Sequence, residues 1–146
     1  MTKQKIAIVT YNRIGAGQYD NGVIERADKQ IYIAQNGHKS KWAANPDSSE
    51  SGKEQTRKNA ATYAVKAFDL KDMDQVFLYV GSDGGEEAIR QTAQIPADNI
   101  TYVMCGCNDS QKRSMISAHG NSKAKIQSCE CGGRDTLEEI LKRLLK

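Results

Sequence analysis

The hydrophobic and polar positions in the first third of the chain predict three strands. Residues 5–11 (KIAIVTY) are apolar and β-branched, which is typical of a strand. Residues 30–35 (QIYIAQ) alternate in polarity and run directly into Asn36-Gly37, a pair that favours a two-residue hairpin turn. Residues 39–44 (KSKWAA) are the natural return strand. The first part of the chain is therefore expected to form an antiparallel meander.

The spacing of apolar residues becomes helical after a Ser-containing polar loop at 46–52. Ala61, Ala64, Val65 and Phe68 occur at i, i+3, i+4 and i+7 within a predicted helix over 53–69. Beyond it, strands and helices alternate. The predicted elements are a strand over 75–80, a helix over about 83–94, a strand over 99–105, a short helix over 109–118, a strand over 124–131 and a final helix that starts at Thr136.

The order of these elements predicts a single α/β domain over residues 1–146. The strand at 75–80 (QVFLYV) is apolar on both sides, as a strand covered on both faces would be. A meander followed by alternating units implies a mixed sheet packed with helices, with right-handed crossovers in its parallel part. We therefore expect a ribonuclease-H-like fold, because a plain doubly wound sheet would not start with a meander.

Composition narrows the class of protein. The chain has 38% hydrophobic and 27% charged residues, and its longest unbroken apolar run, at 76–80, is far too short to cross a bilayer. Its first ten residues hold no apolar stretch of secretory length, so we expect neither a secreted nor a membrane protein. An imported organellar protein stays open. The net charge of +3 is too small to indicate nucleic-acid binding by itself, although residues 29–66 are basic and residues 67–99 are acidic.

Three glycine-containing loops follow predicted strands, at 81–85 (GSDGG), 105–110 (CGCNDS) and 131–135 (CGGRD). In alternating α/β sheets, ligands bind at the carboxyl ends of strands, so a nucleotide, a phosphate or an RNA backbone is a candidate ligand there. The alternative is that these glycines are needed only for the turns. None of the loops is a Walker or dinucleotide-binding motif.

The four cysteines form two C-x-C pairs, with 21 residues between the pairs. If the two predicted strand ends are neighbours, four thiols converge, and four thiolates suit tetrahedral zinc. His119 is a substitute ligand. The alternative interpretation is that two of the thiols are simply buried in the core. The candidate ligands are Cys105, Cys107, Cys129 and Cys131.

Catalytic residues are scarce in this sequence. Only His38 and His119 are conventional general bases, and no serine or cysteine lies in a recognisable nucleophile motif. Asp20, Asp83 and Asp109 are candidate ligands for Mg²⁺ in a nuclease-like site. However, the first predicted strand carries no carboxylate, which a ribonuclease-H-type enzyme needs. This absence argues against an enzyme.

One basic segment favours an anionic partner. Arg57 and Lys58 stand at the start of the predicted helix over 53–69, where cations oppose the helix dipole. On RNA, such residues would neutralise phosphates and contribute salt-dependent affinity.

These residues together resemble the S-eleven family of small-subunit ribosomal proteins. The matching features are Trp42-Ala43 in the predicted return strand, Arg57-Lys58 at the helix start, and GSDGGEEAIR at 81–90. The resemblance covers residues 22–104 and leaves residues 105–146 as a Cys-containing extension with a final helix. The sequence departs from the family in its shorter glycine loop, its shorter helix and its missing basic tail.

The resemblance implies a non-catalytic ribosomal protein that binds small-subunit rRNA and neighbouring ribosomal proteins, with no membrane and no small-molecule substrate. The divergence implies a mitochondrial member, with the cytoplasm as the alternative location. No cofactor is certain, and structural zinc is the candidate. The second hypothesis is a Mg²⁺-dependent nuclease or nucleotide-binding α/β enzyme that uses Asp83 and Asp109. The RNA-binding residues implied are Lys39, Lys41, Lys53, Arg57, Lys58, Asn59, Gly81, Ser82, Gly84, Gly85, Arg90, Lys112 and Arg113.

Overall fold

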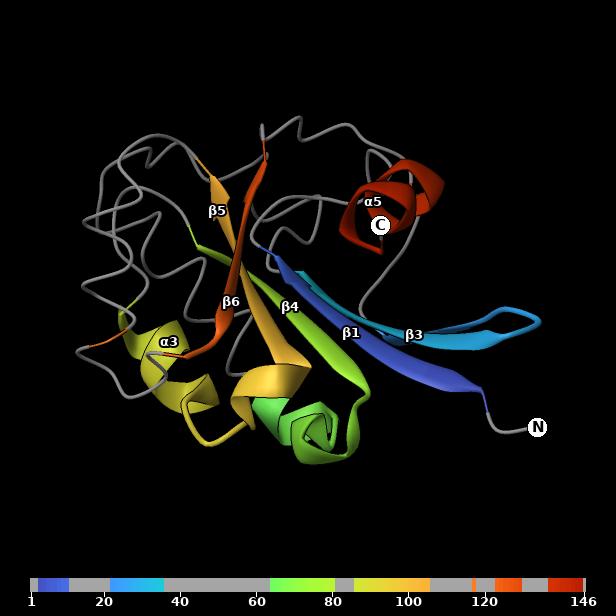
Figure 1. Cartoon of the computed structure of the whole chain (residues 1–146). Helices are drawn as coiled ribbons and strands as arrows, with labels where there is room; N and C mark the ends of the chain where they lie inside the picture. Colours follow the sequence, from blue (N-terminus) through green and yellow to red (C-terminus); the bar gives the residue numbers. More distant parts are fainter. Residues whose placement is uncertain are drawn as a thin grey trace, which may run out of the picture.

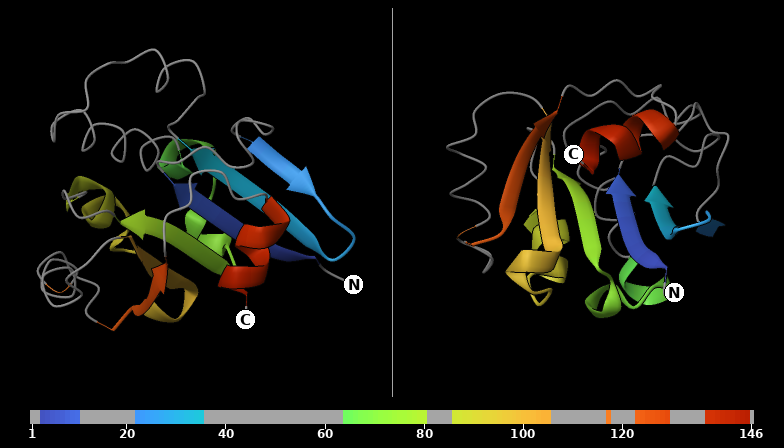
Figure 2. Two further views of the ribbon diagram at one scale, coloured as in Figure 1. Left: turned by 90° about the horizontal axis from the view of Figure 1, so that it is seen from above. Right: turned by 45° about the vertical axis from the view of Figure 1, so that its right-hand side comes forward.

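The computed structural model describes residues 3–10, 22–35, 64–80, 86–105, 117, 123–129 and 137–145. Six strands form one sheet in the order β2-β3-β1-β4-β5-β6 (Figure 1). They are β1 (Gln4–Thr10), β2 (Gly22–Glu25), β3 (Lys29–Gln35), β4 (Gln75–Val80), β5 (Ile100–Cys105) and β6 (Lys125–Cys129). The right-hand view in Figure 2 shows the strands side by side, from orange β6 to cyan β3. The α/β class with a mixed sheet is confirmed.

Among the strands that the structure describes, all ladders except one are parallel. β1 pairs in parallel with β3 on one side and with β4 on the other, and β5 and β6 extend the parallel part. Only β2 and β3 are antiparallel, joined by a turn in which the Arg26 N–H donates to the Lys29 carbonyl at 2.8 Å. The sheet is therefore a five-stranded parallel sheet with one antiparallel edge strand.

The predicted meander is wrong, and with it the ribonuclease-H-like topology. Strands close to the predicted 5–11 and 30–35 are neighbours, but they run parallel. β2 occupies the position beside β3 where the segment at 39–44 was expected, and that segment lies outside the described residues. The physical reason lies in β1, whose Ile6, Ala7, Ile8 and Val9 are at most 1% exposed. A strand apolar on both faces belongs in the interior of a parallel sheet.

Alternating residues of the strands face two separate cores. Ala7 and Val9 belong to one core, together with Phe68, Leu70 and Ile89 from the helical segments on that side. That side carries a helical turn at 64–67, the 3₁₀ turns η2 (Leu70–Asp72) and η3 (Ala97–Asn99), and α3 (Glu86–Thr92). The helical segments thus stabilise this face of the sheet by burying its apolar side chains.

The opposite face is covered by the C-terminal helix α5 (Leu137–Leu144). Ile6 and Ile8 of β1 share this second core with Leu137, Ile140 and Leu144. The apolar stripe predicted for the final helix is confirmed. Figure 1 shows α5 on the side of the sheet opposite α3.

Candidate functional site

The carboxyl ends of the five parallel strands lie along one edge of the sheet, which we call the carboxyl edge. Register fixes their alignment, since Thr10 pairs with Gln35, Val80 with Met104, and Cys105 with Cys129. The sequence predicts that candidate ligand-binding loops follow the strands of an alternating sheet. The segments 81–85 and 106–110 follow β4 and β5, so they start from this edge.

The order in which strands are added to the sheet changes direction at β1. β3 is added on one side of β1, and the next strand in the sequence, β4, is added on its other side. At such a switch point the connections that leave neighbouring strand ends diverge, and α/β proteins bind ligands in the crevice that results. Thr10, the last residue of β1, is 3% exposed and contributes a hydroxyl at this point.

The two cysteine strands are neighbours in exact register. Cys105 ends β5, Cys129 ends β6, and the two are partners in the parallel ladder. The neighbouring strand ends on which the predicted thiol site depended are therefore present, and the site itself stays a prediction. Cys107 and Cys131 fall outside the described residues. Among the described residues there is no group of three or more potential metal ligands.

The structure locates few of the residues predicted to bind RNA. Arg90 is exposed in the last turn of α3, on the helical layer opposite α5. The predicted Mg²⁺ ligands Asp20, Asp83 and Asp109, and both histidines, lie outside the described part of the chain. Also outside it are Lys39, Lys41, Lys53, Arg57, Lys58, Asn59, Gly81, Ser82, Gly84, Gly85, Lys112 and Arg113.

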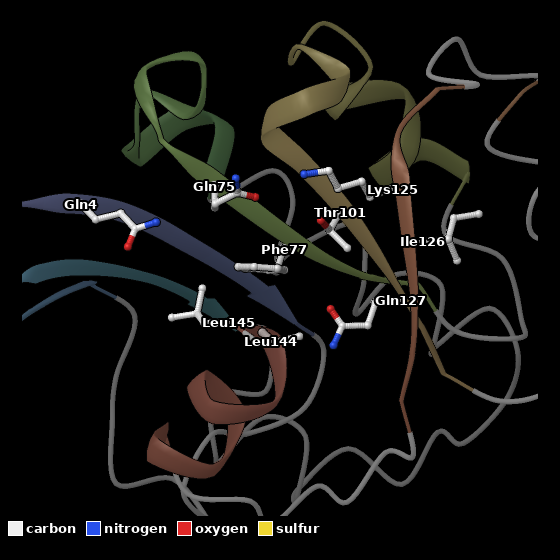
Figure 3. Close-up of a pocket in the computed structure, with 9 residues that line it drawn as sticks. All are labelled: Gln4, Gln75, Phe77, Thr101, Lys125, Ile126, Gln127, Leu144 and Leu145. Carbon is white, nitrogen blue, oxygen red and sulfur yellow. The ribbon is translucent and has the colours of Figure 1, made fainter.

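Sequence reasoning missed a hollow of about 510 Å³ at the opposite, amino edge of the sheet (Figure 3). It opens beside the end of α5, over the first residues of β1, β4 and β6. Lys125 is the one charged residue among the described residues that line it. The lining residues are Gln4, Gln75, Phe77, Thr101, Lys125, Ile126, Gln127, Leu144 and Leu145.

One hydrogen bond shapes the wall of this hollow. The Gln127 Nε2 donates to the backbone carbonyl of Arg143 at 2.9 Å and so satisfies a carbonyl in the last turn of α5. The signal in the sequence was the polar character of Thr101, Lys125 and Gln127 on strands whose other faces are apolar. Lys125 is exposed and Gln127 is half-buried, so these two polar side chains of β6 do not extend the apolar core beside α5.

A second hollow, of about 490 Å³, lies between the β2–β3 turn and α5. The Arg26 Nη2 and the Glu138 Oε1 lie 2.7 Å apart across it. Both side chains are at least one-third exposed, so this ion pair adds little free energy of folding. It does orient the turn against the first turn of α5. There the negative charge of an acidic residue also interacts favourably with the helix dipole and so stabilises the helix.

The β2–β3 hairpin carries the perturbed carboxylates of the described residues. Glu25 accepts hydrogen bonds from Lys3 Nζ at 2.7 Å and from Gln30 Nε2 at 2.9 Å, and these bonds lower its pKa from the ordinary 4.5. The hydrogen bond from Lys29 lowers the pKa of Asp28. Both carboxylates are exposed and held in their charged form, which suits a surface ion pair and not a general acid.

No helix in the part of the chain that the structure describes is both long enough and apolar enough to span a membrane.

Comparison with known proteins gives weak likenesses. No family model and no curated protein matches the chain. The chain is similar to the G domain of the T. maritima FeoB iron transporter, with 16% identity over 99% of this chain and 98% of that chain and a TM-score of 0.41. The cytosolic domain of that transporter in apo form shares 15% identity over 97% of this chain and 62% of that chain, with a TM-score of 0.40. Neither likeness is strong enough to transfer a fold or a function.

The resemblance to the S-eleven ribosomal family is wrong. Its first anchor required the segment at 39–44 to pair with the strand at 30–35, but both edges of β3 are already paired, one with β1 and the other with β2. No family model supports it. The ribosomal function and the role in translation inferred from that resemblance are wrong with it. The rRNA and ribosomal-protein partners have lost that basis and stay untested predictions.

Proposed function

We propose that this protein binds a nucleotide or a related phosphate-bearing small molecule at the carboxyl edge of its sheet, at the β1–β4 switch point. The observation that carries the proposal is the sheet order, in which β1 lies between β3 and β4 and all three run parallel. That arrangement is the one in which doubly wound α/β proteins bind nucleotides and flavins. The nucleotide-binding alternative of the sequence analysis thereby replaces the ribosomal hypothesis.

The segments attached to these two strand ends have suitable chemistry. Thr10 is followed directly by a segment at 11–21 that contains Gly15 and Gly17. Val80 is followed by Gly-Ser-Asp-Gly-Gly at 81–85. Small residues let backbone N–H groups approach a phosphate closely, and a carboxylate such as Asp83 can bind a ribose hydroxyl or the Mg²⁺ that accompanies phosphates.

The sequence also limits which nucleotide chemistry is proposed. A P-loop requires G-x-x-x-x-G-K-[ST], and no segment of this chain has that pattern. We therefore do not propose a P-loop GTPase. Binding would instead depend on the strand-end segments at the switch point.

Equilibrium binding to the full chain tests this proposal. Calorimetric titrations would use ATP, GDP, FMN and inorganic phosphate separately, each with and without Mg²⁺. We expect one ligand of this panel to bind at a single site and Asp83→Asn to weaken that binding at least about tenfold, as the loss of a charged hydrogen-bond partner does.

Asp98→Asn is the matched control. Asp98 is an exposed residue of η3, immediately before β5 and thus at the amino edge. The proposal requires it to leave affinity unchanged. No binding by any ligand of the panel at millimolar concentration, or equal weakening by both substitutions, would contradict the proposal.

Other expectations from the sequence stay predictions. A non-catalytic role is untested, and the proposal concerns binding alone. The mitochondrial location was implied by the ribosomal resemblance and has lost that basis. The division of the chain at residues 22–104 and 105–146 is likewise untested.

A further inference from the structure

The hollow at the amino edge of the sheet combines a cation on one side with an apolar wall on the other. It has a volume of about 510 Å³ and is lined by residues of β1, β4, β5, β6 and the end of α5 (Figure 3). β4 runs from Gln75 at the hollow to Val80 at the carboxyl edge, about 17 Å away. We propose that this hollow binds a small organic carboxylate with an apolar body, at a site separate from the proposed nucleotide site.

The register of the sheet aligns the floor of the hollow. Phe77 of β4 is the ladder partner of Thr101 of β5, and Thr101 is the partner of Lys125 of β6. Ladder partners point to the same face of a sheet, and Phe77 belongs to the core beneath α5, so all three side chains lie on the α5 side. Over two strand spacings, about 10 Å, the floor therefore changes from an aromatic ring through a hydroxyl to an ammonium group.

The apolar wall of the hollow is formed where α5 ends. Leu144, the last residue of α5, is 5% exposed and packs in one core with Phe77. Leu145 follows it, is partly buried and packs against the same core. Both leucines line the hollow. A ligand body placed against them would remove apolar surface from water, which favours binding of an apolar group at this side.

The other side of the hollow favours a negative charge. Figure 3 shows the Lys125 side chain extending from β6 toward Gln75 of β4. No carboxylate in the part of the chain that the structure describes forms an ion pair with Lys125. Its ammonium group is therefore available to a ligand anion, and hydrogen bonds from an ionised donor to an anion are among the strong ones. A single cation matches a single negative charge, which is the charge of a carboxylate.

Thr101 supplies a second polar contact beside this cation. The residue is 5% exposed and lines the hollow. Because it is the ladder partner of Lys125, its Cα atom lies about 4.8 Å from that of Lys125. A hydroxyl can donate a hydrogen bond to a carboxylate oxygen, so Thr101 and Lys125 can hold the same carboxylate.

The polar and apolar sides of the hollow are joined directly. The Gln127 Nε2 of β6 donates to the Arg143 carbonyl of α5 at 2.9 Å. This hydrogen bond connects the strand that carries Lys125 with the helix that carries Leu144. A site whose walls are already held in place loses less conformational entropy when a ligand binds, which favours affinity for a small molecule.

An NMR titration of the ¹⁵N-labelled full chain tests the proposal. The probes are phenylacetate and octanoate, which join one carboxylate to a compact ring or to a flexible chain. We expect at least one of these acids to saturate a single site at millimolar concentration, with the largest amide shifts at Thr101, Lys125 and Gln127. Thr10 and Val80, at the carboxyl edge, should show none.

Two further probes separate the contributions of the charge and the apolar body. Phenethylamine replaces the negative charge with a positive one, and acetate lacks the apolar body. Each should bind at least about tenfold more weakly than the tighter of the two acids, because each loses one of the two kinds of contact.

Two lysine substitutions separate a specific site from a general attraction to basic residues. Lys125→Met removes the charge and keeps an unbranched side chain, so it should weaken binding of the acid at least about tenfold. Lys123→Met is the matched control, because Lys123 is exposed and is not among the residues that line the hollow. It should leave the affinity unchanged. Failure of both acids to saturate a site at millimolar concentration, equal binding of phenethylamine, or equal weakening by the two substitutions would overturn the proposal.

Discussion

Val9 of β1 and Leu78 of β4 are partners in a parallel ladder, and both side chains are 1% exposed. This pairing places the first strand of the chain in the middle of the sheet, because β3 pairs with the other side of β1. The central position of β1 creates the switch point at the carboxyl edge. It is therefore the relationship on which the proposed function depends.

The burial of the central strands on both faces predicts that alanine substitutions at two valines differ strongly in their effect on the free energy of unfolding. Val76 of β4 is fully buried, whereas Val23 of the edge strand β2 is 47% exposed. Val76→Ala should lower the free energy of unfolding by about 2 kcal/mol, from lost burial and the cavity left behind. The matched Val23→Ala should cost less than about 1 kcal/mol. Urea denaturation measures both, and equal effects would contradict the described burial.

The apolar stripe of α5 predicts that this helix depends on packing and not on helix propensity. Leu137 is fully buried against the sheet, and Lys142 on the same helix is exposed. Leu137→Ala should destabilise the fold by about 2–4 kcal/mol. Lys142→Ala should change stability by about 0.5 kcal/mol or less. If Leu137→Ala left both the free energy of unfolding and the hydrogen exchange of α5 unchanged, that result would contradict the described packing of this helix on the sheet.

The Arg26–Glu138 ion pair predicts a small coupling between the β2–β3 turn and α5. A double-mutant cycle with Arg26→Ala and Glu138→Ala should give a coupling free energy of about 0.2–1 kcal/mol, since both side chains are partly exposed. The coupling should shrink at high salt because solvent-exposed charges are screened. A zero coupling at low salt would show that the pair does not form in solution.

The hydrogen bonds to Glu25 predict a dependence of hairpin stability on pH. Because the Lys3 and Gln30 bonds lower its pKa in the folded state below 4.5, the stabilisation is complete above that pH. It is lost as the pH falls through the lowered value. An NMR titration of the Glu25 carboxyl carbon measures this pKa, and Lys3→Ala should raise it. Titration of Glu25 at 4.5 or above in the unsubstituted chain would refute the interaction.

Much of the fold was predictable where the hydrophobic pattern is strong. Residues 76–79 of the apolar strand at 75–80 are buried on both faces, and the leucine-rich C-terminal helix packs as its stripe indicates. The parallel pairing of β1 with β3 was not predicted, because β2, which lies between them in the sequence, was missed and the two predicted strands were expected to be consecutive strands of a meander. The continuous apolar run in β1 was the better signal, since it indicates burial on both faces.

The candidate sites were predictable to different extents. The C-x-C spacing indicated a thiol cluster, but only the register of β5 and β6 shows that Cys105 and Cys129 are neighbours. The switch point at β1 could not be recognised from sequence, because it depends on which strands pair over long separations. The hollow at the amino edge also depends on where α5 ends over β4 and β6, which no local pattern specifies.

The most direct test of the central claim is to map the bound ligand on the sheet by NMR. Backbone amide shifts of the ¹⁵N-labelled chain would be recorded during titration with the tightest ligand of the nucleotide panel. Our account predicts that the largest shifts within β1 and β4 occur at Thr10 and Val80, with Gln4 and Gln75 unaffected. Shifts concentrated at Gln4, Gln75 and Lys125 would place the ligand in the amino-edge hollow and contradict it.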